Sequence, residues 1–122
     1  GFIKVGTGED LKIYHDGSNS YIEDSGTGRL LIKGSGVRIN SASNENMIHA
    51  ETDGAVELYY DNVKKLSTDG DGIIVHGAEG GEASIYLWAD EGDDNADKYR
   101  LKVPDGGPLQ IGNKHSGSWD AK

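Results

Sequence analysis

Cysteine is absent from this chain of 122 residues. Its absence excludes a disulfide framework, a thiolate zinc site and a cysteine nucleophile. Long apolar runs are also missing, and none approaches the roughly 20 residues that a membrane-spanning helix needs. The first four residues lack the charged start and apolar run of a secretory signal. Because residue 1 is Gly and not Met, the sequence suggests a fragment or a processed chain.

Apolar and basic residues are both scarce. Hydrophobic residues make up 34% of the chain, so it has difficulty building a sizeable core alone, and association is expected to supply the missing burial. The chain contains 12 Lys and Arg residues and 21 Asp and Glu residues, which gives a net charge of −9. This balance argues against binding to a nucleic-acid backbone or to an anionic membrane. An acidic surface would instead keep an extended assembly soluble.

Glycine is abundant, with 19 residues that stand singly or in pairs between strand-like runs and therefore mark turns. No segment shows a sustained helical period, and short runs with period-two alternation at 8–12-residue spacing are typical of an all-β chain. On one such run Leu11 and Ile13 are expected on one side, with Lys12 and Tyr14 on the other. The expected strands cover residues 2–5, 11–15, 21–24, 29–33, 37–40, 47–52, 56–60, 63–67, 73–76, 83–88, 98–103 and 109–112.

Three segments share one pattern, residues 11–34, 56–77 and 83–112. Each begins with an apolar-polar-apolar-Tyr strand and an Asp-bearing turn, and continues with a return strand, a Gly turn, a third apolar strand and a closing Gly. In the second unit the turn is Asp61-Asn62, which suits a two-residue type I′ hairpin. Repetition of a unit too small to bury its own face indicates stacking along an axis.

The residue sequences of these units resemble those of a known protein family. Residues 10–22 read DLKIYHDGSNSYI and residues 56–65 read VELYYDNVKK, with supporting phrases at 90–98 and 113–119. These phrases resemble the repeats of tail-fibre and other virion structural proteins of tailed bacteriophages, especially marine ones. The resemblance implies a fibrous virion component, commonly trimeric, from a family in which receptor binding also occurs.

Acidic residues gather in the loop at residues 90–97, where hard oxygen ligands could hold Ca²⁺. The spacing does not match the EF-hand loop, so a solvated acidic turn and a weak or intersubunit cation site both stay open. Five carboxylates take part: Asp90, Glu91, Asp93, Asp94 and Asp97.

The histidines are scattered, at positions 15, 49, 76 and 115. On a three-fold axis His15 or His76 could bind a metal with one ligand per chain, whereas ordinary strand and turn histidines are the alternative.

The aromatic residues could form a platform on which sugars stack, or they could pack across the sheet and against a neighbouring subunit. They are Tyr14, Tyr21, Tyr59, Tyr60, Tyr86, Trp88 and Trp119. No nucleophile elbow, phosphate-binding loop or metal-ligand cluster is recognisable, since the Gly-x-Gly sequences at 6–8 and 34–36 lack a following helix and Lys. We therefore predict no enzymatic activity, no cofactor and no dedicated metal or catalytic site.

The prediction is an all-β chain of short-strand hairpins, stacked into an elongated, fibre-like β-prism or β-helix and forming an intertwined homotrimer. Residues 1–122 would be a single repetitive fibre domain. The expected function is a self-assembling shaft component of a phage-like virion appendage, located in the tail fibre or otherwise extracellular, with a contribution to host attachment. Two alternatives are a carbohydrate-binding adhesin module that recognises a cell-surface glycan, and a subunit of a polymerised extracellular filament. The expected partners exclude nucleic acid and membrane.

Overall fold

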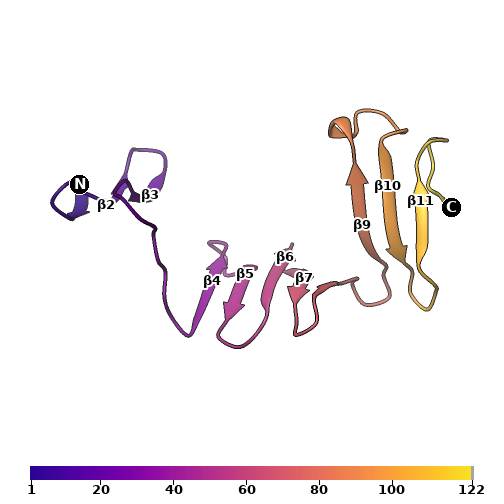
Figure 1. The fold of residues 1–122 in the computed structure, drawn as a ribbon, viewed down its shortest axis with the longest axis horizontal. Helices are drawn as coiled ribbons and strands as arrows, with labels where there is room; N and C mark the ends of the chain where they lie inside the picture. The colour runs from indigo at the N-terminus through magenta and orange to yellow at the C-terminus, as the bar shows by residue number, and fades with distance from the viewer. Residues whose placement is uncertain (122) are drawn as a thin grey trace. The chain divides into compact units, whose positions relative to one another are not determined.

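The computed structural model describes residues 1–121, and within them the chain is all-β, as predicted. The strands form three antiparallel sheets, and the single helical element is a short 3₁₀ turn, Asp90–Gly92 (Figure 1). The chain divides into two compact units, Gly1–Lys33 and Gly34–Lys122. The organisation of residues 1–122 as one repetitive fibre domain stays a prediction.

The first unit holds one sheet with the strand order β1-β2-β3. Each strand pairs with the one before it, because short turns return the chain directly. At the β2–β3 turn, one carboxylate oxygen of Asp16 accepts hydrogen bonds of 2.8 Å from the backbone N–H groups of Ser18 and Asn19. An Asp side chain is well suited to bond the backbone of its own turn in this way. The strands are β1 (Phe2–Val5), β2 (Leu11–His15) and β3 (Ser20–Asp24).

The second unit holds two sheets, with strand orders β4-β5-β6-β7-β8 and β12-β11-β10-β9. Every pairing joins strands that are consecutive in sequence, so both sheets are meanders. The first sheet contains β4 (Gly36–Asn40), β5 (Asn46–Glu51), β6 (Val56–Tyr60), β7 (Val63–Thr68) and β8 (Ile73–Val75). The second contains β9 (Ala83–Trp88), β10 (Lys98–Val103), β11 (Gln110–Asn113) and β12 (Asp120–Ala121).

The β6–β7 hairpin closes through the turn Asp61-Asn62, as predicted. Tyr60 and Val63 pair directly across it, so the loop has two residues. Asp61 has φ 49° and Asn62 has φ 61°, and positive φ at both central residues defines type I′. The Asn62 side chain also accepts a hydrogen bond of 2.9 Å from the backbone N–H of Asn46, which ties the turn to β5.

One predicted strand is wrong. Residues 29–33 form no strand, and in the described chain their backbone groups have no hydrogen-bond partner. The physical reason is that a β-strand needs a ladder from a neighbouring strand, which apolar content alone does not provide. Smaller differences occur at the C-terminal end, where β11 begins one residue later than expected and the polar tail contributes β12.

We expect Asn62→Val to destabilise the β6–β7 hairpin. A β-branched residue is strained at positive φ, by about 1–2 kcal/mol, and valine also loses the bond to the Asn46 amide. The free energy of unfolding from urea titration measures the effect. The control is Asn62→Gly, which permits positive φ and loses only the side-chain bond, so it should be the milder change. Equal losses for the two variants would show that the backbone conformation is unimportant.

Candidate functional site

The five-stranded sheet carries a continuous aliphatic row on one face. The strand register places Ile39 beside Ile48, Ile48 beside Leu58, Leu58 beside Leu66, and Leu66 beside Val75. Side chains at directly opposite positions of paired strands share a face, so one row crosses all five strands. Ile39 is 48% exposed and Leu58 is 40% exposed. Nothing in the sheet itself covers this face.

The other two sheets carry the same kind of row. The members of each row are directly opposite one another in the register of paired strands. Leu11 lies on the same side of β2 as Ile13, as predicted. The rows are Ile3, Ile13 and Ile22 in the first sheet, and Ile85, Leu101 and Ile111 in the third. Among the described residues no apolar side chain is buried. Each sheet is therefore a single layer without the second layer that encloses a core.

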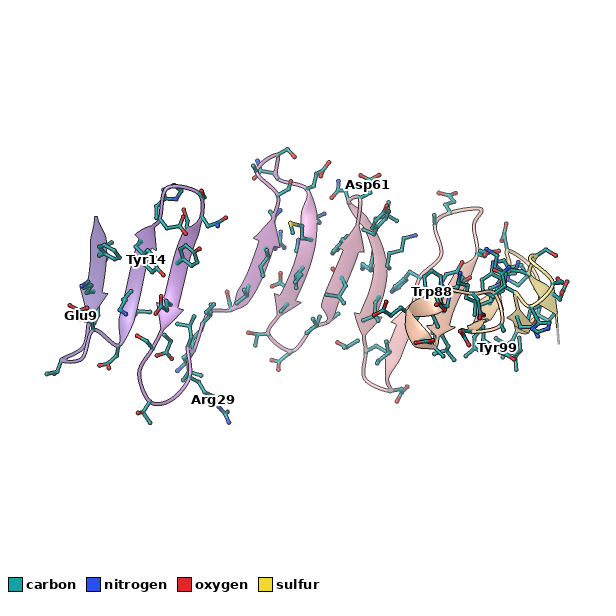
Figure 2. The ribbon with its side chains drawn as sticks, turned by 90° about the horizontal axis from the view of Figure 1, so that it is seen from above. Glu9, Tyr14, Arg29, Asp61, Trp88 and Tyr99 are labelled. Atoms are coloured by element: carbon teal, nitrogen blue, oxygen red, sulfur yellow. The ribbon has the colours of Figure 1, made fainter. Side chains whose placement is uncertain are left out.

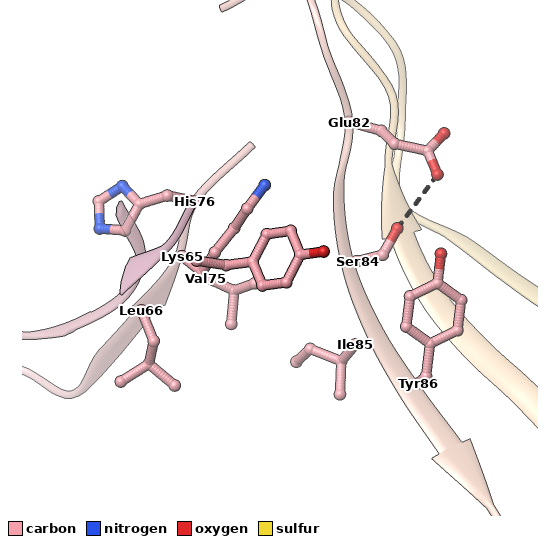
Figure 3. A pocket seen from close by; sticks show the side chains of 9 residues that line it. Lys65, Leu66, Val75, His76, Glu82, Ser84, Ile85 and Tyr86 are labelled. Atoms are coloured by element: carbon pink, nitrogen blue, oxygen red, sulfur yellow. Dashed lines mark hydrogen bonds between the residues drawn. The ribbon is translucent and has the colours of Figure 1, made fainter. Parts of the chain in front are cut away.

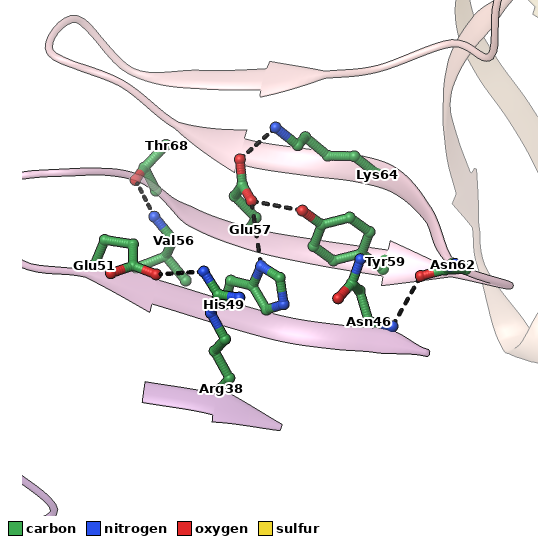
Figure 4. Close-up of polar contacts among 10 residues, drawn as sticks. All are labelled: Arg38, Asn46, His49, Glu51, Val56, Glu57, Tyr59, Asn62, Lys64 and Thr68. Atoms are coloured by element: carbon green, nitrogen blue, oxygen red, sulfur yellow. Dashed lines mark hydrogen bonds and ion pairs between the residues drawn. The ribbon is translucent and has the colours of Figure 1, made fainter. Parts of the chain in front are cut away.

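The opposite face of the five-stranded sheet is polar and internally bonded (Figure 4). Glu57 lies at its centre, accepting a 2.6 Å hydrogen bond from the Tyr59 hydroxyl and a short ion-pair contact from Lys64. The His49 Nδ1 atom lies 3.7 Å from the same carboxylate. Beside them, Arg38 pairs with Glu51 at 3.2 Å.

Electrostatics at Glu57 follow from these contacts. The hydrogen bond from Lys64, followed by that from Tyr59, lowers the pKa of the Glu57 carboxyl below its ordinary value. The carboxylate in turn raises the pKa of Lys64 and of the Tyr59 hydroxyl. The lowered pKa of Glu57 and the raised pKa of Lys64 favour the charged forms of both groups, so the ion pair persists at neutral pH, and the raised pKa of Tyr59 keeps its hydroxyl protonated.

Burial in this sheet is inverted relative to an ordinary soluble sheet. His49 at 8% and Ser67 at 6% exposure, both on the polar face, are its most buried side chains. Long polar side chains cover one another there, whereas the aliphatic row stays open. The face that needs a covering partner is therefore the aliphatic one, which we call the aliphatic face in each sheet.

The predicted aromatic platform divides into separate groups. Tyr14, on the first sheet (Figure 2), stacks on Tyr21 with ring centroids 4.7 Å apart and also contacts Phe2. Tyr59 packs against His49. Tyr60 is 74% exposed.

A second aromatic group lies on the third sheet. Tyr86 lies 6.1 Å from Trp88 and 5.7 Å from Trp119. Lys98 lies over the Trp88 ring and Arg100 over the Trp119 ring, which are cation–π contacts. Sequence reasoning missed these two cations, although Lys98 follows the acidic loop directly. The predicted pairing of strand 83–88 with strand 98–103 is the pattern that could have placed these two cations beside the aromatic rings.

The acidic loop brings three of its five carboxylates together. Ligand oxygens of Asp90, Asp93 and Asp97 lie within 4.8 Å of one another, whereas Glu91 and Asp94 lie outside this group. Asp94 instead accepts a 2.7 Å bond from the Ala96 amide. Exposed acidic groups adopt such spacing without a cation, so both interpretations of the loop stay open.

The histidines do not gather in the described part of the chain. His15 contacts Ser20 at 3.2 Å, and the His76 Nε2 atom lies 2.8 Å from the Ser67 hydroxyl. His49 has a buried Nε2 atom without a hydrogen-bond partner. The Ser67–His76 contact resembles a nucleophile–base pair, but Ser67 is buried and no described third group orients the imidazole.

An open hollow lies where β7 and β8 meet β9 (Figure 3). Its walls combine aliphatic side chains with a few polar ones, and the Ser84 hydroxyl donates a 3.3 Å bond to Glu82. The lining residues are Tyr60, Lys65, Leu66, Val75, His76, Glu82, Ser84, Ile85 and Tyr86. Since Leu66 and Val75 belong to the aliphatic row, the hollow continues the aliphatic face.

No family model, curated protein or solved structure matches this chain. Among the described residues, no helix has the length and apolar character required to cross a bilayer.

We expect the polar face to make stability depend on acid pH. Because the folded-state pKa of Glu57 is lowered, its contribution is complete above the unfolded value of about 4.3. The contribution is lost as the pH falls through the folded value. The Glu57→Gln variant should be less stable than wild type at pH 7, and the difference should shrink at pH values below about 4.

Thermal unfolding from pH 7 to pH 3 checks this expectation. The matched control is Glu45→Gln, in an exposed loop where the side chain makes no ion pair with a described residue. A constant difference between wild type and Glu57→Gln across this range would contradict the assigned role.

Proposed function

We propose that this chain is a structural subunit that assembles with copies of itself into a fibre, as a shaft component of a phage-like virion appendage. The observation that carries the proposal is the inverted burial of the five-stranded sheet, together with the exposed aliphatic rows of all three sheets. The polar face of the five-stranded sheet is largely bonded within one chain, whereas Ile22, Leu58 and Ile111 of the aliphatic rows are 62%, 40% and 48% exposed.

The energetic argument concerns the missing second layer. Burying one Leu or Ile side chain stabilises a protein by about 1.5–3 kcal/mol, and a sheet normally gains this by packing on another layer. Leu58 and its neighbours in the row gain only part of it within one chain. Identical copies offer the same aliphatic faces, so mutual packing would supply the missing burial in each.

A homotrimer in which the sheets form a β-prism or β-helix is the arrangement we favour. The aliphatic faces would point inward and the bonded polar faces outward. Three chains would carry a charge of 3 × −9 = −27, which would keep neighbouring fibres from bundling. The resemblance of residues 10–22 and 56–65 to phage fibre repeats supports the trimer and a location in the virion. A filament polymerised from the same unit is the alternative assembly.

One observation favours a second function, the binding of a cell-surface glycan. Tyr86 and Trp88 are 49% and 57% exposed, and they lie together with Trp119 on the polar face of the third sheet. Exposed aromatic rings beside hydrogen-bonding side chains can stack on sugars. If this function is present, Trp88→Ala should abolish binding to a glycan array without changing the assembly. Loss of assembly in that variant would instead place Trp88 at a subunit contact.

We expect a trimeric mass of about 39 kDa for wild type, since one chain has a mass of 13.0 kDa and 3 × 13.0 = 39. Leu58→Asp puts a charge in the centre of the aliphatic face and should raise the dissociation constant at least about tenfold. Analytical ultracentrifugation over a concentration series measures both quantities.

The matched control is Asn44→Asp, which adds the same charge in an exposed loop where Asn44 has φ 65°. Its assembly should equal that of wild type. A stable, folded wild-type monomer of 13.0 kDa would refute self-assembly. Electron microscopy of the assembled protein distinguishes a trimeric shaft from a polymerised filament.

A further inference from the structure

Residues 29–33 occupy the position of the third strand in the first repeat, residues 11–34. In the second repeat, the third strand β8 pairs with the second strand β7, and in the third repeat β11 pairs with β10 in the same way. In the first repeat the second strand is β3, whose outer side has no neighbour within residues 1–121. One unpaired strand-like segment and one free strand edge therefore occur in the same unit.

The first and second repeats align residue by residue here. Residues 22–34 read IEDSGTGRLLIKG and residues 66–77 read LSTDGDGIIVHG. A four-residue, Gly-containing turn follows the second strand in both, and the first repeat then has one additional residue, Arg29. Leu30, Leu31 and Ile32 thus correspond to Ile73, Ile74 and Val75.

The second repeat closes its turn through Asp69. The Asp69 amide donates a 2.9 Å bond to the Gly72 carbonyl, and the Asp69 carboxylate accepts bonds from the Asp71 and Gly72 amides. These bonds reverse the chain and bring Ile73 opposite Thr68. Asp is well suited to this turn because its side chain can bond its own backbone.

The first repeat lacks this closure. Ser25 replaces the turn-closing Asp, and its amide donates a 2.8 Å bond to the Asp10 carbonyl, on the β2 side of the sheet. The chain therefore leaves β3 away from its outer edge. As a result Leu31 and Ile32 are 72% and 68% exposed, and residues 29–33 have unpaired backbone groups among the described residues.

We propose that residues 29–33 of one copy pair, as an antiparallel strand, with the outer edge of β3 in a second copy of this chain. The register of β7 with β8 then places Ile32 opposite Ile22, and Leu30 opposite Asp24. Leu30 and Ile32 extend the aliphatic row of the first sheet, and Leu31 projects from the other face.

A second copy is the fitting partner because every chain contains both the donor segment and the acceptor edge. Each copy gives one strand and receives one, so the contact is head-to-tail. Such a contact closes into a ring if the rotation between copies permits, and otherwise generates a filament. The inference rests on the proposed self-assembly and adds the pairing that makes the copies intertwined.

Disulfide trapping tests the pairing, because the natural chain contains no cysteine. Ile22→Cys and Ile32→Cys are made in separate chains, mixed, unfolded, refolded together and oxidised. By analogy with Leu66 and Val75, the two positions are directly opposite, with Cβ atoms roughly 4.5–5.5 Å apart and within reach of a bond after small movements. We expect a disulfide-linked pair of chains on a non-reducing gel.

The matched control replaces Ile32→Cys by Leu31→Cys, on the opposite face of the same segment. It should give at least about tenfold less of the linked pair, because neighbouring residues on a strand point to opposite faces. Each variant oxidised alone measures random linkage. Amide exchange of wild type provides a readout without substitutions, since the amides of residues 30–32 should be protected in the assembly and lose protection on dissociation.

The outcomes separate this inference from the proposed function. A linked pair in the mixture supports strand donation. An assembled protein that gives no linked pair overturns it and leaves self-assembly intact, as does an Ile22→Cys/Ile32→Cys double variant that links only within one chain. A monomeric wild-type protein overturns both.

Discussion

The cross-strand network around Glu57 is the interaction on which the character of the five-stranded sheet depends. Lys64 and Tyr59 satisfy its carboxylate from the same face, and His49 packs beside them. Because Glu57, Lys64 and Tyr59 are bonded to one another within one layer, these three side chains need no partner from a second layer. The side chains of the aliphatic face cannot form hydrogen bonds or ion pairs with one another, and they stabilise the protein only when they are removed from water.

An aliphatic row on one face recurs in all three sheets, and it fits the low share of bulky apolar residues in the chain. Because successive side chains of a strand point to opposite faces, a strand with one polar face needs an aliphatic residue at every second position only. A core shared among copies then needs fewer apolar residues per chain than a core built by one chain alone. The stacked pair Tyr14 and Tyr21 lies on the polar face of the first sheet, and Tyr86 and Trp88 lie on the polar face of the third.

Much of the local structure could be predicted from residue patterns. The period-two alternation at Leu11 and Ile13 identified their shared face, and Asp61-Asn62 identified the type I′ turn. The prediction failed at residues 29–33, whose apolar composition suits a strand as well as that of β8 does. Composition does not show whether a neighbouring strand is available. Here Ser25 stands in the position of the turn-closing Asp69 and Arg29 is one residue more than in the second repeat, so the chain does not return along the free edge of β3.

The sequence by itself determined the all-β class, the positions of most strands and the turns, because these depend on side-chain period and on local backbone preferences. Only the tertiary structure decided which residues become neighbours across strands. A register shift between Leu58 and Tyr59 places Lys64 opposite Tyr59, within reach of Glu57. Tyr86 and Trp88 share a face of β9, and Trp119 joins them only because β9, β10, β11 and β12 pair in that order. The predicted turn aligns β6 with β7, but the β-bulge that shifts their register was not visible in the residue pattern.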